Sequence, residues 1–241
     1  MILINKQKPS AQILENIRQV KSDIGFGVDK SKQVRTMRTA FNQLDKDAIR
    51  SQLLREQKGI CAYCMRRIHN NEHTVIEHLK PIDGFSDEAL SYDNMVACCD
   101  GGSNLAVKPH TLCCDASKGN TEITISPYNT EHMEKIRYDR KGRIYIYPED
   151  RILSNDINRA LKLNGEIDND GTFINDTATR LVYGRRQAYR NYEVFIKGLT
   201  KKKKNIKNAL LKKEHEILSA KEYPEYAGVW LYFIRKKLHS T

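Results

Sequence analysis

The sequence predicts an α-rich α+β fold in which helical flanks enclose a loop-rich centre with short strands. Apolar residues recur at helical spacing in both flanks, whereas the centre has only short β-branched or alternating runs. All six cysteines lie between Cys61 and Cys114. We therefore divide the chain into an N-terminal helical region (1–58), a central core (59–128) and a C-terminal region (129–241).

The N-terminal region carries three helical patterns. Residues 10–22, 34–44 and 49–59 each place apolar side chains at intervals of three and four, which is typical of one buried helix face. Gly25 and Gly27 follow the first pattern and are expected to end that helix. The third pattern continues the second, from 34 to 59, so a helical region is expected before the first cysteine.

The C-terminal region begins with a predicted hairpin and continues as helices. Residues 136–147 alternate between apolar and polar side chains on both sides of a central Lys-Gly, which predicts two paired strands. From Asp176 an apolar stripe predicts a long helix. Two further helices are expected over residues 205–220 and 228–238, separated by a Tyr-Pro breaker.

The charge of the chain points to an anionic partner. Lysine and arginine exceed the acids by 11, and the isoelectric point is near 9.3. Nucleic acid is the commonest partner of such a chain, and an excess of solvated surface lysine is the alternative. The sequence has neither a run of eighteen apolar residues nor a secretory signal, so we expect a cytoplasmic protein outside the membrane.

The cysteines predict a structural zinc site. Cys61-Ala-Tyr-Cys64 is a C-x-x-C knuckle, and the doublets Cys98-Cys99 and Cys113-Cys114 can complete a tetrahedral set of four sulfurs. A redox pair has the same C-x-x-C spacing, but it does not require the two doublets, and the βαβ pattern that usually surrounds it is absent from the sequence. Structural Zn²⁺ is therefore the favoured interpretation.

A second group of candidate functional residues lies among the cysteines in the sequence. Glu77-His78 follows the β-branched run Thr74-Val75-Ile76, and an extended backbone projects neighbouring side chains to opposite sides. One of the two can hold a hard cation such as Mg²⁺ while the other stays free as a base near neutral pH. Asn94 and the segment Cys114-Asp115-x-x-Lys118-Gly119 follow.

This order resembles that of the HNH, or ββα-metal, endonucleases. Their pattern is C-x-x-C, then [DE]-H-x-x-P, then an asparagine, then C-[NHD]-x-x-K-G, and the match covers residues 61–120. The resemblance implies a zinc-stapled ββα-metal core flanked by the N- and C-terminal helices. It also implies hydrolysis of phosphodiester bonds, which DNA and RNA present equally.

The resemblance implies a role for each matched residue. His78 would be the general base that activates water, and Asn94 would brace the loop that orients it. Glu77 and Asp115 would ligate a catalytic Mg²⁺ or Mn²⁺ that stabilises the phosphorane and the leaving oxygen. Lys118, one helical turn after Asp115, would meet a phosphate.

The resemblance also indicates which cysteine of each doublet binds the zinc ion. Cys99 and Cys114 fit its spacing best as partners of the knuckle, with Cys98 and Cys113 as alternates, because residues 100–112 form an insertion. Three histidines lie near the site but off the pattern. We expect them to be solvated, with the last as a minor candidate for the zinc or the phosphate: His69, His73 and His110.

Two segments are similar to one HNH subfamily. These are residues 49–64 and the Leu-Lys-Leu-Asn of residues 161–164 with a later arginine-bearing helix. The subfamily is the nuclease subunit of Septu-type and retron-associated antiphage systems. This similarity implies an ABC-like ATPase partner and, in a retron, a reverse transcriptase with its RNA–DNA hybrid.

Basic residues after position 179 suit such a role. Eight lysines and no acid lie between Lys197 and Lys213, and this lysine run is a solvated helix face, a phosphate-tracking surface or a docking site for an acidic partner. Four arginines on the predicted long helix either grip substrate or extend from the core: Arg180, Arg185, Arg186 and Arg190.

The sequence therefore predicts a metal-dependent HNH endonuclease, the toxic effector of an antiphage complex with an ATPase. One alternative is a non-catalytic zinc-finger module that binds nucleic acid and carries an inert Glu77-His78 pair. A stand-alone restriction or homing-type nuclease is the other alternative. The C-terminal half has no catalytic motif, so we expect it to bind partners.

Overall fold

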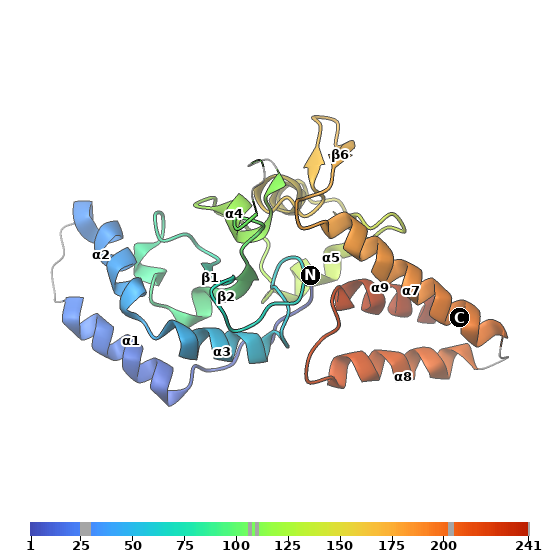
Figure 1. The fold of residues 1–241 in the computed structure, drawn as a ribbon, viewed down its shortest axis with the longest axis horizontal. Helices are drawn as coiled ribbons and strands as arrows, with labels where there is room; N and C mark the ends of the chain where they lie inside the picture. Colours follow the sequence, from blue (N-terminus) through green and yellow to red (C-terminus); the bar gives the residue numbers. More distant parts are fainter. Residues whose placement is uncertain (25–29, 106–107, 109–110, 202–204, 241) are drawn as a thin grey trace.

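The computed structural model describes residues 1–24, 30–105, 108, 111–201 and 205–240. The molecule is elongated, with the N-terminal helices at one end, the C-terminal helices at the other and the cysteine-rich centre between them (Figure 1). The glycines expected to end the first helix, Gly25 and Gly27, lie outside the described residues. No described helix has the length and apolar composition needed to cross a membrane.

The N-terminal region is helical, as predicted, and it consists of three helices. The first buries Ile13 and Ile17, and the third buries Leu53. Asp45 caps the third, because its carboxylate accepts a hydrogen bond from the Ala48 amide at 3.0 Å. Their bounds are α1 (Ala11–Ile24), α2 (Lys30–Gln43) and α3 (Lys46–Glu56).

The centre holds an antiparallel strand pair followed by a short helix. Strand β1 (Thr74–His78) pairs with β2 (Met95–Cys99), and the register joins Thr74 to Cys99 and His78 to Met95. Two 3₁₀ turns lie in the connection, over Ser86–Glu88 and Tyr92–Asn94. Helix α4 (Cys114–Lys118) then packs against β2, and α3 packs against both strands. The chain order is thus strand, strand, helix.

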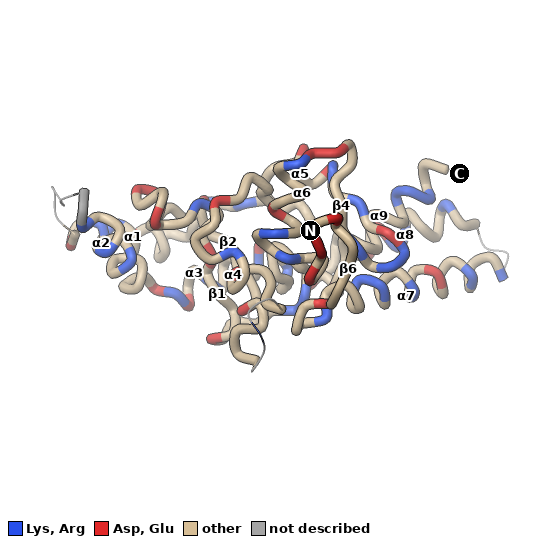
Figure 2. Tube along the Cα trace, turned by 90° about the horizontal axis from the view of Figure 1, so that it is seen from above, with Lys and Arg blue, Asp and Glu red and all other residues tan. Residues whose placement is uncertain are grey.

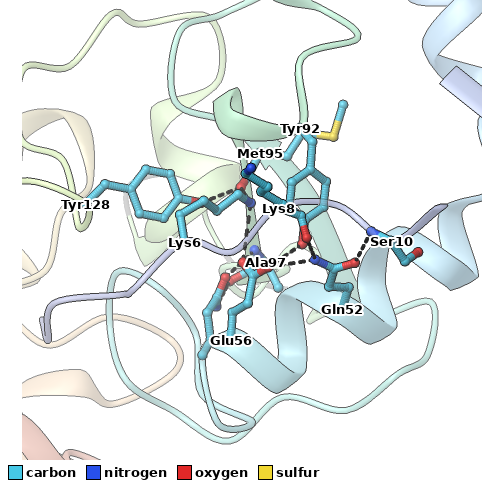
Figure 3. Close-up of polar contacts among 10 residues, drawn as sticks. Lys6, Lys8, Ser10, Gln52, Glu56, Tyr92, Met95, Ala97 and Tyr128 are labelled. Carbon is cyan, nitrogen blue, oxygen red and sulfur yellow. Dashed lines mark hydrogen bonds and ion pairs between the residues drawn. The ribbon is translucent and has the colours of Figure 1, made fainter. Parts of the chain in front are cut away.

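The extended segment before α1 ties α3 to β2 (Figure 3). The Lys6 ammonium donates a hydrogen bond to the Met95 carbonyl at 2.9 Å and lies 3.5 Å from the Glu56 carboxylate. The Gln52 amide donates to the Lys8 carbonyl, also at 2.9 Å. Glu56 further accepts from the Tyr92 hydroxyl at 2.8 Å. These contacts hold α3 and β2 together, and both elements pack against the rest of the cysteine-rich centre.

In the C-terminal region a short helix precedes the predicted hairpin, and the later helices pack together through aromatic side chains. The Tyr192 ring packs on Phe233 and Trp230 at centroid distances of 5.7 and 5.9 Å. Helices α7, α8 and α9 contact one another pairwise. The elements are α5 (Thr130–Lys135), β3 (Ile136–Tyr138), β4 (Ile144–Ile146), α6 (Arg151–Asn155) with a π-helical turn at Asp156–Ala160, β5 (Glu166–Ile167), β6 (Phe173–Asn175), α7 (Leu181–Lys201), α8 (Ile206–Ser219) and α9 (Ala227–Leu238).

The long helix begins later than the sequence predicts. It starts at Leu181, not at Asp176, because Arg180 has a left-handed backbone with φ of 56°. The Asp176 carboxylate caps the helix from outside by accepting hydrogen bonds from the amides of Val182 and Tyr183 at 3.0 and 2.8 Å. The predicted helix is therefore present, but residues 176–180 precede it and cap its first turn.

Buried apolar side chains form one continuous cluster from Met1 to Ile234 that runs through all three regions. Arg185 lies inside it, 1% exposed. Its guanidinium donates to the Gly142 carbonyl at 2.7 Å and to the Leu163 carbonyl at 2.6 Å. Arg185 therefore joins α7 to the hairpin and to residues 161–164, and it is not available to a substrate.

Candidate metal centre and active site

Four cysteine sulfurs converge in the centre. The knuckle supplies Cys61 and Cys64, the end of β2 supplies Cys99 and the start of α4 supplies Cys114. All four sulfurs lie within 4.8 Å of one another and are buried. The Cys64–Cys99 and Cys61–Cys114 distances are 3.7 and 4.0 Å. A zinc ion with bonds of about 2.3 Å to four sulfurs requires sulfur–sulfur edges of about 3.8 Å.

The donor set suits a tetrahedral divalent metal ion. All six cysteines are free thiols. Burial raises the pKa of the Cys64 thiol and so disfavours its thiolate form. Because the thiolate is the form that binds a metal ion, binding of the cation must supply the free energy of this deprotonation. Four sulfurs without an oxygen ligand favour zinc. The four residues can therefore hold a structural zinc ion.

The other two cysteines have different surroundings. Cys113 lies 3.6 Å from the Gly101 carbonyl and 3.3 Å from the Thr179 hydroxyl, and Cys98 is buried in β2 outside the group of four. The structure thus separates the two members of each doublet as the resemblance implies. The described sheets are antiparallel strand pairs, so the βαβ context of a redox pair is absent from the described part of the chain.

His78 ends β1, and its hydrogen bond defines its tautomer. The ring nitrogen Nε2 lies 2.9 Å from the Ala89 carbonyl. Because a carbonyl only accepts, Nε2 must carry the hydrogen, which leaves Nδ1 unprotonated. Burial, with the cations of Lys46, Lys118 and Arg38, lowers the pKa of His78 to about 4 despite the Ala89 bond. The imidazole is therefore a neutral base at pH 7.

Two carboxylates meet beside β1. Glu77 neighbours Asp115 of α4, and burial together with this neighbour raises the pKa of Glu77 to about 8. The Lys118 ammonium lies 2.7 Å from Glu77 and offsets part of this charge. A buried and a half-buried carboxyl group in contact suit a further cation, and oxygen ligands select hard ions such as Mg²⁺ or Mn²⁺.

Asn94 holds the chain that follows His78. Its side-chain oxygen accepts from the Lys80 amide at 2.8 Å, and its side-chain nitrogen donates to the Lys80 carbonyl at 3.0 Å. Its own carbonyl accepts from the Leu79 amide at 2.9 Å. The end of the connecting segment is thus fixed against the residues immediately after the histidine.

Lys118 differs from its expected role. Its side chain is 1% exposed, and besides Glu77 it contacts the His78 carbonyl, to which it donates at 2.9 Å. Both contacts are internal, so in this structure the Lys118 ammonium is occupied by Glu77 and by the end of β1. Lys118 therefore positions the carboxylate and the strand end, and the expected phosphate contact is replaced by an internal one.

The sequence analysis did not find three residues around His78. The Phe41 ring packs edge-on against the imidazole at a centroid distance of 4.5 Å, and the Lys46 ammonium lies over the same Phe41 ring. Ala89 supplies the carbonyl. None carries a motif signal, because each contact depends on how α2 and the connecting segment fold over β1.

The off-pattern histidines and part of the lysine run are also placed. His69 and His73 are exposed, as expected, and Asn104 donates to His73 at 2.7 Å. His110 and residues 202–204 lie outside the described residues. No protein-family model and no curated protein matches the chain.

Proposed function

We propose that the chain is a metal-dependent HNH (ββα-metal) endonuclease that hydrolyses phosphodiester bonds of nucleic acid. One observation carries the proposal: at the end of β1, His78 is a neutral imidazole of defined tautomer, and the residue before it, Glu77, contacts Asp115 of α4. A base beside a hard-cation site is what metal-assisted attack of water on phosphorus requires. The basic surface of the chain suits the polyanionic substrate.

In this mechanism His78 Nδ1 accepts a proton from water as the water oxygen forms its bond to phosphorus. The bond between phosphorus and the leaving sugar oxygen breaks, and that oxygen takes up a proton from solvent. Glu77 and Asp115 would hold the divalent cation, which supplies stabilisation of the charge on the phosphorane and on the leaving oxygen. Asn94 keeps the base in position through Lys80.

The four cysteines have a structural role in the proposal. Cys99 ends the strand that pairs with β1, and Cys114 is adjacent to Asp115. A zinc ion bound by these residues and the knuckle would fix α4 against β2. It would therefore hold Asp115 near Glu77, although it takes no part in the reaction.

We further propose that the nuclease is the effector of a bacterial antiphage complex. An ABC-like ATPase would be its partner, and a reverse transcriptase with its RNA–DNA hybrid would join in a retron. The support is the similarity of residues 49–64 and 161–164 to the nuclease subunits of such systems. Affinity purification from the native cell tests this proposal, because a stand-alone restriction or homing-type nuclease would elute without an ATPase.

The central experiment is cleavage of labelled DNA and RNA with Mg²⁺ or Mn²⁺ by the wild type and by His78→Ala. We expect the variant to lose roughly 10²–10⁴-fold in rate, since it lacks the general base. The matched control is His73→Ala, which changes an exposed histidine that contacts neither Glu77 nor Asp115 and should cut normally. A wild type that binds both nucleic acids and cuts neither would be a zinc-finger binding module instead.

A further inference from the structure

Helix α2 presents an acid-free row of cations that leads to His78. Its fourteen residues contain four lysines and arginines and no carboxylate. Lys32, Arg35 and Arg38 follow one another at intervals of three and are exposed. Residues three apart are neighbours on a helix surface, and Phe41 is the next in this series. Because Phe41 packs on His78, the row ends at the proposed base.

The row is fixed to the strand pair, and most of its charge is unpaired. Arg38 forms an ion pair with Asp83, in the segment after β1, and contacts Asn120 just after α4. Lys32 and Arg35 make no ion pair with another described residue. Figure 2 shows the basic positions along α2 at the end of the molecule away from the C-terminal helices. The exposed charge therefore faces solvent beside the site.

Lys46 gives independent evidence for an anion at the end of the row. Its amine nitrogen is buried and has no hydrogen-bond partner among the described residues. It lies over the Phe41 ring that also contacts His78. Burial, with Arg50 as a lesser cause, lowers the pKa of Lys46 to about 7. An unpaired buried ammonium is unfavourable, and binding an anion restores a partner to it.

We propose that Lys32, Arg35 and Arg38 form a track for the phosphate backbone of the substrate and that Lys46 contacts the scissile phosphodiester. The inference rests on the proposed nuclease function and deepens it. The track holds the strand by charge alone, because its lysines and arginines meet phosphates and no base edge. Lys46 would place a phosphate oxygen beside the imidazole, and the track would set the direction of the strand.

The track is tested by binding in the His78→Ala background, without added divalent cation. Fluorescence anisotropy at several salt concentrations would compare Lys32→Ala/Arg35→Ala with Lys141→Ala/Lys221→Ala, which removes the same charge from exposed positions elsewhere. We expect weaker binding in the α2 pair. Its slope of log K against log salt should flatten by nearly 2 for a duplex, about 0.9 for each lost phosphate contact. Equal behaviour of the two pairs would overturn the track.

Lys46 is tested by cleavage with Lys46→Met and Lys46→Arg, each checked for folding by thermal unfolding. We expect Lys46→Met to retain binding and lose at least tenfold in maximal rate, and Lys46→Arg to recover part of it. A Lys46→Met rate equal to wild type would overturn the assignment. Failure of the wild type to cut any nucleic acid would instead refute the nuclease proposal, while the anisotropy comparison would still decide whether α2 binds the backbone.

Discussion

The buried ammonium of Lys118 lies 2.7 Å from the carboxylate of Glu77, and the two side chains are 1% and 8% exposed. The same ammonium donates to the His78 carbonyl at 2.9 Å. One side chain on α4 thus holds both the side chain of one strand residue and the backbone of the next. The relative position of α4 and β1 depends on this pair as well as on the cysteines.

Replacing Lys118 by methionine should destabilise the protein by about 1–3 kcal/mol, because the buried Glu77 carboxyl group and the His78 carbonyl would both lose their hydrogen-bond donor. Urea unfolding with and without Mg²⁺ measures this effect. We expect Mg²⁺ to restore part of the loss, since a cation at Glu77 and Asp115 takes over the role of the ammonium. Unchanged stability of the variant would show that the pair contributes little to the fold.

The zinc assignment predicts different behaviour for the two cysteines of one doublet, Cys98 and Cys99. Cys99→Ser should lose the metal ion, because its sulfur belongs to the group of four, whereas Cys98→Ser should retain one zinc per chain. Elemental analysis of the purified variants gives the answer. Equal zinc in both would contradict the ligand set, and a zinc-free wild type would remove the site altogether.

Asn94 should affect the reaction through the loop that it holds. Asn94→Ala removes both side-chain hydrogen bonds to Lys80, whereas Asn94→Asp keeps the acceptor for the Lys80 amide and loses the donor. We therefore expect the maximal cleavage rate to fall in the order wild type, Asn94→Asp, Asn94→Ala, with little change in KM. A KM effect without a rate effect would assign Asn94 to substrate binding instead.

The Lys6 network predicts how stability depends on pH. Burial lowers the pKa of Lys6 from an ordinary value of 10.5 to about 8, while Glu56 opposes the shift. Between these pH values the unfolded chain binds more protons than the folded protein, so stability rises with pH. The unfolding free energy of wild type relative to Lys6→Met should therefore increase by about 2–3 kcal/mol from pH 8 to pH 10.5. A flat difference would mean that Lys6 titrates normally.

Sequence patterns predicted the features that depend on local spacing. Apolar periodicity located the helices, and the resemblance to the HNH pattern selected Cys99 and Cys114 over their neighbours. Contacts between distant segments could not be predicted in this way. The burial of Lys118 and Arg185 reverses the usual preference of charged side chains for solvent, and the partners that make it possible are 40 and 43 residues away in the sequence.

The lysine run provides the last prediction, because it lies far from the proposed base. Its described members include the exposed Lys197, Lys201, Lys207 and Lys212 on α7 and α8, at the opposite end of the long axis from α2 (Figure 1). Changing all four to glutamine should weaken binding of the ATPase partner or of long nucleic acid, and flatten its salt dependence. Cleavage of a short oligonucleotide should be unchanged, since such a substrate reaches α2 and not α8. Loss of short-substrate cleavage would show that the two ends of the molecule do not act separately, and normal binding of both partners would identify the run as a solvated helix face.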